Sequence, residues 1–165
     1  MEIFILSYSF QKGDVFMFQD SIGKKSKKVK NTVERGAVKR FAEAIGNVHP
    51  IFVDEEYGKQ SRYGQNIAPI TFPRVFDYGK IEDFYLPNIG LIHGEQIYHY
   101  ERPLLVGEEI YCYTEVVDYY EKNGSMGLIG FVILKAYGDD KEGKVIYSET
   151  QTVLVTEAVR KELDR

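Results

Sequence analysis

The fold is decided by the stretch Phe41-Ala42-Glu43-Ala44-Ile45-Gly46-Asn47-Val48-His49-Pro50-Ile51-Phe52-Val53-Asp54. Its first half continues a run of apolar residues at helical spacing, so a helix is expected over residues 33–45. Gly46 suits the end of that helix, because glycine readily adopts the left-handed conformation found there. Asp54 is a typical N-cap residue and predicts a second, short helix over residues 55–60. An irregular segment therefore joins the two helices.

Beyond this stretch the apolar pattern changes from helical to alternating. Residues 69–79 are mainly apolar and predict one more helix, with Pro73 tolerated only in its first turn. A short strand is expected near residues 27–33. Four long strands are expected at residues 95–102, 109–120, 127–137 and 144–156. The Asn123-Gly124 pair marks a hairpin turn between two of them.

Helices followed by strands in this order predict an α+β fold. The helical material is expected to pack on one face of a single antiparallel sheet, with the long strands arranged as a meander. The outer strands of a meander have unpaired backbone groups, so a sheet that continues across a dimer is expected.

The composition is that of one globular domain. The chain has 165 residues, of which 44% are hydrophobic, and a net charge of -4. A nucleic-acid-binding surface would need a basic face, and no apolar run reaches the roughly 20 residues that span a bilayer. The basic cluster at residues 24–30 is either a solvated surface or an attraction for a phosphorylated or acidic ligand. The single cysteine, Cys112, fits a cytoplasmic protein and is expected to be a buried structural thiol.

The first residues do not show the pattern of the rest. Residues 1–16 are interpreted as an N-terminal extension whose start site is wrongly assigned, and Met17 is the expected native start. They lack the basic beginning and the small-residue cleavage site of a signal peptide. The domain is therefore expected to comprise residues 17–165.

Three blocks of the sequence resemble the MaoC-like (R)-specific hydratase and dehydratase family, in particular its N-terminal, non-catalytic type of dehydratase domain. The first block is residues 33–54, which contains the opening stretch. The second is Tyr-Gly-Gln-Asn-Ile-Ala-Pro-Ile-Thr-Phe-Pro at residues 63–73. The third, residues 93–108, begins His-Gly-Glu-Gln and ends Arg-Pro-Leu-Leu-Val-Gly-Glu. The blocks occur in the family's order.

The resemblance implies a single hot-dog domain, in which an antiparallel sheet wraps a central helix, here Pro69 to about Tyr85. It implies an acyl thioester substrate, carried on CoA or on acyl carrier protein, with no other cofactor. The family's reaction is the reversible addition of water across the 2,3-position of the acyl group. A second hot-dog chain is expected as partner, in a homodimer or a heterodimer.

The resemblance also locates the catalytic positions. The family uses an Asp and a His five positions apart as acid and base, and those positions hold Asn47 and Phe52 here. An amide does not accept a proton at neutral pH, and a phenyl ring neither donates nor accepts one. His49 lies between them, either as a replacement catalytic group or as a histidine that bonds to its own loop.

Four further residues are candidates for substrate binding. Ile70 and Thr71 would offer backbone N–H groups to the thioester oxygen at the start of the central helix. The sequence of this loop is explained equally well if its residues only begin the helix. His93 and Gln96 lie at the start of the first long strand, where they contact the thioester or only bond to the strand. The histidines and acids have no spacing typical of a metal site.

The leading interpretation is a subunit that shapes the acyl pocket of a (3R)-hydroxyacyl-thioester dehydratase while its partner supplies the Asp/His pair. One alternative is a self-contained homodimeric hydratase or thioesterase with altered residues, for which Asp77 and Glu82 are candidate acids. The other is a module that binds acyl-CoA without turnover.

Overall fold

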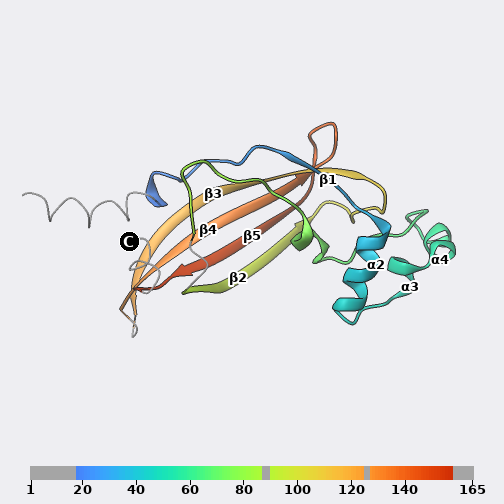
Figure 1. The fold of residues 1–165 in the computed structure, drawn as a ribbon, viewed down its shortest axis with the longest axis horizontal. Coiled ribbons are helices and arrows are strands. Elements are labelled where there is room, and N and C mark those ends of the chain that lie inside the picture. Colours follow the sequence, from blue (N-terminus) through green and yellow to red (C-terminus); the bar gives the residue numbers. More distant parts are fainter. Residues whose placement is uncertain (1–17, 87–89, 125–126, 158–165) are drawn as a thin grey trace, which may run out of the picture.

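A computed structural model of the chain describes residues 18–86, 90–124 and 127–157. The expected start at Met17 and the extension before it lie outside the described residues. Within them, one antiparallel sheet and a group of short helices at one of its ends account for the regular structure (Figure 1).

The sheet has five strands in the order β1-β3-β4-β5-β2 (Figure 1). They are β1 (Val29–Thr32), β2 (Leu91–Tyr100), β3 (Glu109–Gly124), β4 (Gly127–Asp139) and β5 (Val145–Val155). All five expected strands are confirmed. A simple meander is wrong, because only β3, β4 and β5 follow one another, while β2 pairs with β5 at the far edge. The connection 101–108 carries the chain from one edge of the sheet back to β3, which also pairs with β1.

Three α-helices precede β2: α2 (Arg35–Ala44), α3 (Pro50–Val53) and α4 (Glu55–Gln60). The helices expected at 33–45 and 55–60 are confirmed. Asp54 caps α4 as predicted, since its Oδ1 accepts from the amides of Glu56 at 2.9 Å and Tyr57 at 3.1 Å. The short α3 lies inside the segment expected to be irregular.

The expected central helix from Pro69 to Tyr85 is not formed. This segment contains only the 3-10 helix η1 (Phe72–Val75) and is then extended. Pro73 removes a donor, and Gly79 adopts φ +68°, where a Cβ atom would lie 2.9 Å from the carbonyl oxygen of Lys27. The side chain of Asn31 accepts from the Asp77 amide at 2.9 Å and donates to the Asp77 carbonyl at 2.8 Å. These bonds hold the segment extended beside β1.

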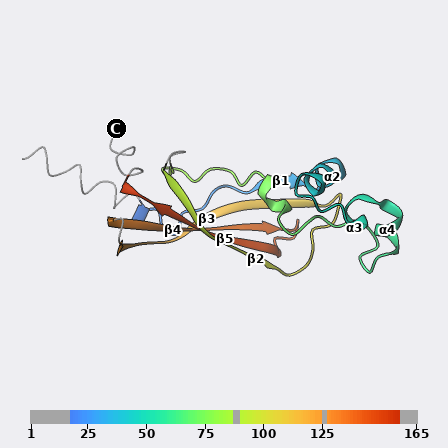
Figure 2. The same cartoon turned by 90° about the horizontal axis from the view of Figure 1, so that it is seen from below.

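Helices and extended segments cover one face of the sheet (Figure 2). Toward the helices this face carries an apolar cluster that includes Phe72, Leu104 and Tyr147, and at the other end a smaller one around Phe18 and Tyr119. None of the helices in the described residues is long and apolar enough to cross a membrane.

Tyr147 lies flat across β4 at Gly138. A Cβ atom on Gly138 would overlap the ring of Tyr147, which is fully buried. We expect Gly138→Ala to lower the free energy of unfolding by about 1–3 kcal/mol, because the ring has no space to move. Urea unfolding monitored by circular dichroism measures this. Gly124→Ala in β3 is the matched control, since no atom lies within 4 Å of its added Cβ. Equal midpoints for the two variants would contradict the packing described here.

Candidate functional site

The segment between α2 and α4 overhangs one end of the sheet. Gly46 ends α2 with φ +69°, and the backbone of Asn47 returns to α2 by donating to the carbonyl of Ala42 at 2.8 Å. The side chain of Asn47 is exposed. Phe52, in α3, is half-buried and packs against the larger apolar cluster.

Phe52 borders a hollow of about 400 Å³. Its walls are mainly apolar and come from the overhang, from the loop before η1, and from the end of β2 and its following turn. The lining residues are Phe52, Ile67, Ala68, Ile70, Tyr100, Glu101, Arg102, Pro103 and Leu104. Ile70 stands at the rim with 66% of its surface exposed, and its carbonyl accepts from the Tyr100 hydroxyl at 2.6 Å.

Asn66 fixes the overhang in place. It is buried, and its Nδ2 donates to the carbonyls of Ile51 at 2.8 Å and Asp54 at 2.7 Å. Its Oδ1 accepts from Arg35 at 2.9 Å, so one amide links three segments. Gly58 makes the approach possible, because a Cβ there would lie 2.6 Å from the backbone nitrogen of Asn66. The sequence assigned no role to Asn66, since a polar residue in a loop carries no local sign of burial.

His49 caps α3. Its Nδ1 accepts from the amide of Ile51 at 3.1 Å, and its ring makes edge contacts with Phe52 and Tyr57. This arrangement matches the loop-bonding role considered for His49. A catalytic role for its other ring nitrogen stays a prediction.

Ile70 and Thr71 precede the 3-10 turn instead of an α-helix. Within the described parts of the chain, neither of their amides has a hydrogen-bond acceptor, so both keep the donor capacity expected from the sequence. Their contact with a thioester stays a prediction.

His93 and Gln96 lie on β2, on the helix-covered face of the sheet. His93 shares a 3.1 Å hydrogen bond with Gln151, and the Gln96 amide is buried with neither of its polar atoms bonded to another described residue. Gln96 lies four positions before Tyr100, which places it roughly 13 Å along the strand from the Phe52 hollow. The structure therefore does not bring these two residues together with Asn47 and Phe52.

The candidate acids lie elsewhere as well. Asp77 accepts from the amide of Gly79 at 2.8 Å in the extended segment, and Glu82 is exposed and 3.5 Å from Lys27. Neither lines the Phe52 hollow, where the acid present is Glu101 at the rim. The described residues also contain no group of three His, Cys, Asp or Glu that could hold a metal ion.

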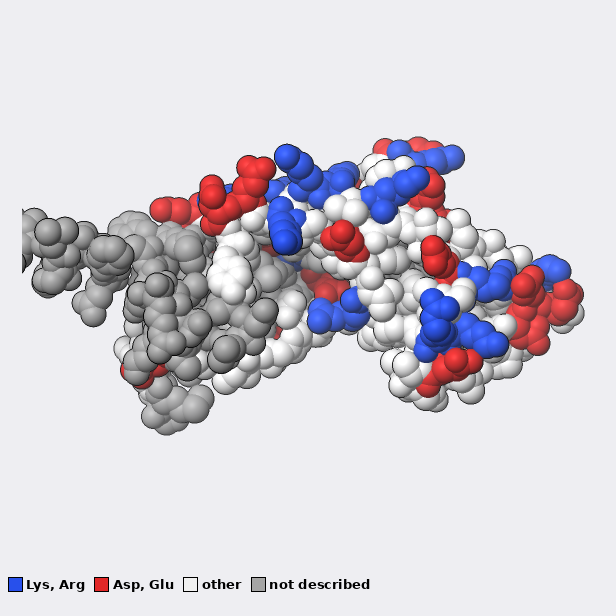
Figure 3. All heavy atoms as spheres, in the orientation of Figure 1, with Lys and Arg blue, Asp and Glu red and all other residues white. Residues whose placement is uncertain are grey.

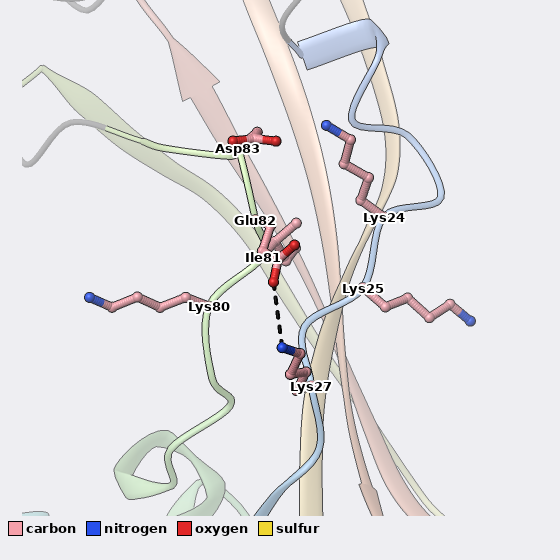
Figure 4. Close-up of a pocket in the computed structure, with 7 residues that line it drawn as sticks. All are labelled: Lys24, Lys25, Lys27, Lys80, Ile81, Glu82 and Asp83. Carbon is pink, nitrogen blue, oxygen red and sulfur yellow. Dashed lines mark ion pairs between the residues drawn. The ribbon is translucent and has the colours of Figure 1, made fainter.

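The lysine cluster forms the side of a separate hollow of about 310 Å³ (Figure 4). Lys24 and Lys27 point toward Asp83 and Glu82, whereas Lys25 and Lys80 point away. Both signs of charge are also interspersed on the face shown in Figure 3. Four lysines of the cluster pair with acids of the same chain, an arrangement typical of a solvated surface: Lys25 with Glu115, Lys27 with Glu82, Lys28 with Asp139 and Lys30 with Glu109.

Burial suppresses the acidity of a group of side chains beneath the helices. Cys112 is fully buried, as expected, 3.4 Å from the Tyr147 hydroxyl, which shares a 2.8 Å hydrogen bond with Tyr78. Burial raises the pKa of Cys112 to about 12 and raises the pKa of both tyrosines above their usual range. The thiol is therefore protonated at neutral pH and a poor nucleophile.

Two results are expected from the raised pKa of Cys112. The folded protein should resist a thiol reagent such as DTNB at neutral pH and react fully in urea.

Stability should also depend on alkaline pH, because the unfolded chain loses the thiol proton near the ordinary pKa of 9.0, before the folded chain does. The stability from this group is therefore complete below pH 9.0 and is lost as pH rises toward about 12. Rapid modification of the folded protein, or unchanged stability at alkaline pH, would contradict this.

A family model described as "FAS1-like, dehydratase domain region" matches residues 20–149. The chain belongs to this dehydratase family. Among curated relatives, a UPF0336 protein of Thermobifida fusca is 33% identical over 92 residues, which are 52% of this chain and 60% of that protein. A UPF0336 protein of Mycobacterium tuberculosis is 26% identical over 132 residues, covering 76% of this chain and 80% of the relative.

Solved structures confirm the hot-dog fold of this FAS1-like dehydratase domain. The C-terminally truncated HadBC complex, a 3R-hydroxyacyl-ACP dehydratase of Mycobacterium tuberculosis, contains a chain with a TM-score of 0.70 at 21% identity, covering 82% of this chain and 97% of that one. The MaoC-like dehydratase from Rhodospirillum rubrum has a TM-score of 0.64 at 21% identity. The match covers 84% of this chain and 94% of that one. These likenesses confirm the expected MaoC-like hot-dog architecture, and at such identity they carry the fold alone.

Proposed function

We propose that this chain is the pocket-forming subunit of a (3R)-hydroxyacyl-thioester dehydratase or enoyl hydratase, and that a partner hot-dog chain supplies the acid and base. The observation that carries the proposal is Phe52, a phenyl ring in the place of the family's histidine, packed into the apolar wall of the hollow. On this proposal the segment has a structural role in the wall of the hollow, and proton transfer falls to the partner.

The chemistry explains why these two positions matter. Dehydration removes a proton from C2 and protonates the hydroxyl leaving C3, giving an enoyl thioester and water. Each lost general acid or base typically costs roughly 10²-fold to 10⁴-fold in rate. Neither Asn47 nor Phe52 can move a proton at neutral pH, and the Nδ1 of His49 is used as a helix cap. We therefore favour a partner's acid and base over a self-contained enzyme.

The apolar hollow fits an acyl group in this function. Burial of alkyl carbons against Phe52, Ile67 and Ile70 provides binding energy, and the free amides of Ile70 and Thr71 are donors suited to a thioester oxygen. The proposed substrate is an acyl thioester on CoA or acyl carrier protein, with no other cofactor.

The exposed edge of the sheet supports a partner chain. Strand β2 pairs with β5 along one side, and its side chains Ile92 and Ile97 are 44% and 51% exposed. A second sheet adding to this edge would pair the open backbone groups of β2 and reduce the exposure of both side chains. The similar structures include two complexes, HadBC and ChsH1-ChsH2, which fits a dimer of hot-dog chains here. The protonated, buried thiol of Cys112 is compatible with the cytoplasm, which we propose as its compartment.

The purified chain alone is expected to hydrate crotonyl-CoA no faster than the uncatalysed background. Activity should appear when it is mixed with a MaoC-like chain that carries an intact Asp/His pair, which is best sought among neighbouring genes. Loss of enoyl absorbance measures the rate, and light scattering measures complex formation. Hydration at a normal enzymatic rate by this chain alone would overturn the division of roles.

Binding in the hollow can be tested without turnover. We expect Ile70→Glu to weaken binding of a medium-chain acyl-CoA by about tenfold or more, because it places a charge against the apolar wall. Val75→Glu is the matched control, since Val75 is 54% exposed on the neighbouring turn and does not line the hollow. Calorimetric titration compares the two. An equal loss in both variants would move the acyl site elsewhere.

A further inference from the structure

We infer that a second hollow, centred on Glu149 and Arg74, binds a neutral group with a hydrogen-bond donor, carried on the acyl chain of the substrate. This inference rests on the proposed function and narrows its substrate class from plain acyl thioesters to hydroxylated or amide-bearing ones. The hollow has a volume of about 210 Å³ and lies on the helix-covered face of the sheet. It is lined by Arg74, Phe76, Tyr78, Thr114, Leu134, Ala136, Glu149 and Gln151.

Glu149 is the buried acceptor in this hollow. It is 4% exposed, and its Oε1 accepts from the guanidinium of Arg74 at 3.1 Å. Its Oε2 is buried and has no hydrogen bond of good geometry among the described residues, although the side chain of Tyr98, opposite Glu149 in the sheet, lies close enough to interact with the carboxylate. A buried carboxylate oxygen without a donor costs free energy comparable to a lost hydrogen bond, so a ligand that donates to it gains that amount.

The charges select a neutral donor. Arg74 already balances the charge of Glu149, so an ammonium group in the hollow would add an uncompensated charge there. A hydroxyl or amide supplies the missing hydrogen bond without that cost. The neighbouring Gln96, opposite Gln151 in the sheet, adds an amide whose donor and acceptor are both buried and unpartnered. The polar side chains of Glu149, Gln151 and Gln96 therefore lie side by side on β5 and β2, between the two apolar clusters.

This hollow and the Phe52 hollow border adjacent rows of side chains on the same face of the sheet. Tyr100, which lines the Phe52 hollow, pairs with Tyr147, and the next row on the same face pairs Tyr98 with Glu149. The two rows are about 7 Å apart along the sheet. Ala136 and Thr114 are small, which leaves the hollow open beside Glu149. The inference requires an acyl chain to pass the stacked rings of Tyr100 and Tyr147, which lie between the two hollows.

Calorimetry with straight-chain acyl-CoA thioesters of increasing length, each paired with its ω-hydroxy counterpart, tests the inference on the purified chain. At the length that reaches Glu149, the hydroxylated thioester should bind about tenfold more tightly than the plain one, because it donates to a charged acceptor. Shorter pairs should show no such preference.

Glu149→Met identifies the acceptor. The side chain keeps a similar size, and Arg74 is half-exposed and can turn to solvent, so folding should be retained. The preference for the hydroxyl should be lost or reversed. Glu115→Met is the control, because Glu115 is a partly buried, paired carboxylate on the opposite face of the same sheet.

The outcomes separate the two proposals. Equal affinity of plain and hydroxylated thioesters at every length would overturn this inference and leave the proposed function standing. A preference that survives Glu149→Met would overturn it too. Absence of binding by both series would contradict the proposed function itself, and the inference with it.

Discussion

Two hydrogen bonds between the side chain of Asn31 and the backbone of Asp77 determine how the helix-covered face of the sheet is shaped: Asn31 accepts one from the Asp77 amide and donates the other to the Asp77 carbonyl. They hold the segment after η1 extended beside β1, where a hot-dog domain of the expected kind would place a helix over the sheet. As a result, Phe76 and Tyr78 become walls of a hollow, and Arg74 reaches the buried carboxylate of Glu149. A single polar side chain on β1 thus controls how much space lies above β4 and β5.

The overhang between α2 and α4 is held by side chains that bond to its backbone. Asn66 binds two carbonyls of the overhang, Asp54 caps α4, and His49 caps α3. Each of these interactions positions backbone, and none needs a proton to move. The side chain of Asn47 is exposed and takes no part in these bonds, whereas Phe52 contributes packing against the larger apolar cluster.

Local signals in the sequence were enough to predict most of the helices and strands. Capping by Asp54, the glycine at residue 46 and the alternating strands each depend on neighbouring residues, and each was predicted correctly. The helix at residues 69–85 was wrong because apolar spacing there is helical while Asn31, distant in sequence, captures the backbone. The position of β2 beside β5 was missed for the same reason, since strand order is set by long-range pairing. Glu149 was missed because its neighbours Ser148 and Thr150 are polar too, so its burial has no local sign.

The Arg74–Glu149 pair is also difficult to explain as a device for stability. Arg74 is half-exposed while Glu149 is buried, so solvent weakens the attraction and the carboxylate still bears most of its desolvation cost. An apolar residue at 149 would extend the larger apolar cluster from Tyr147 along β5 as far as Gln151. A fold under selection for stability alone would gain from that change. The polar side chains instead leave a hollow between the two clusters, which is the space that the proposed substrate group would occupy.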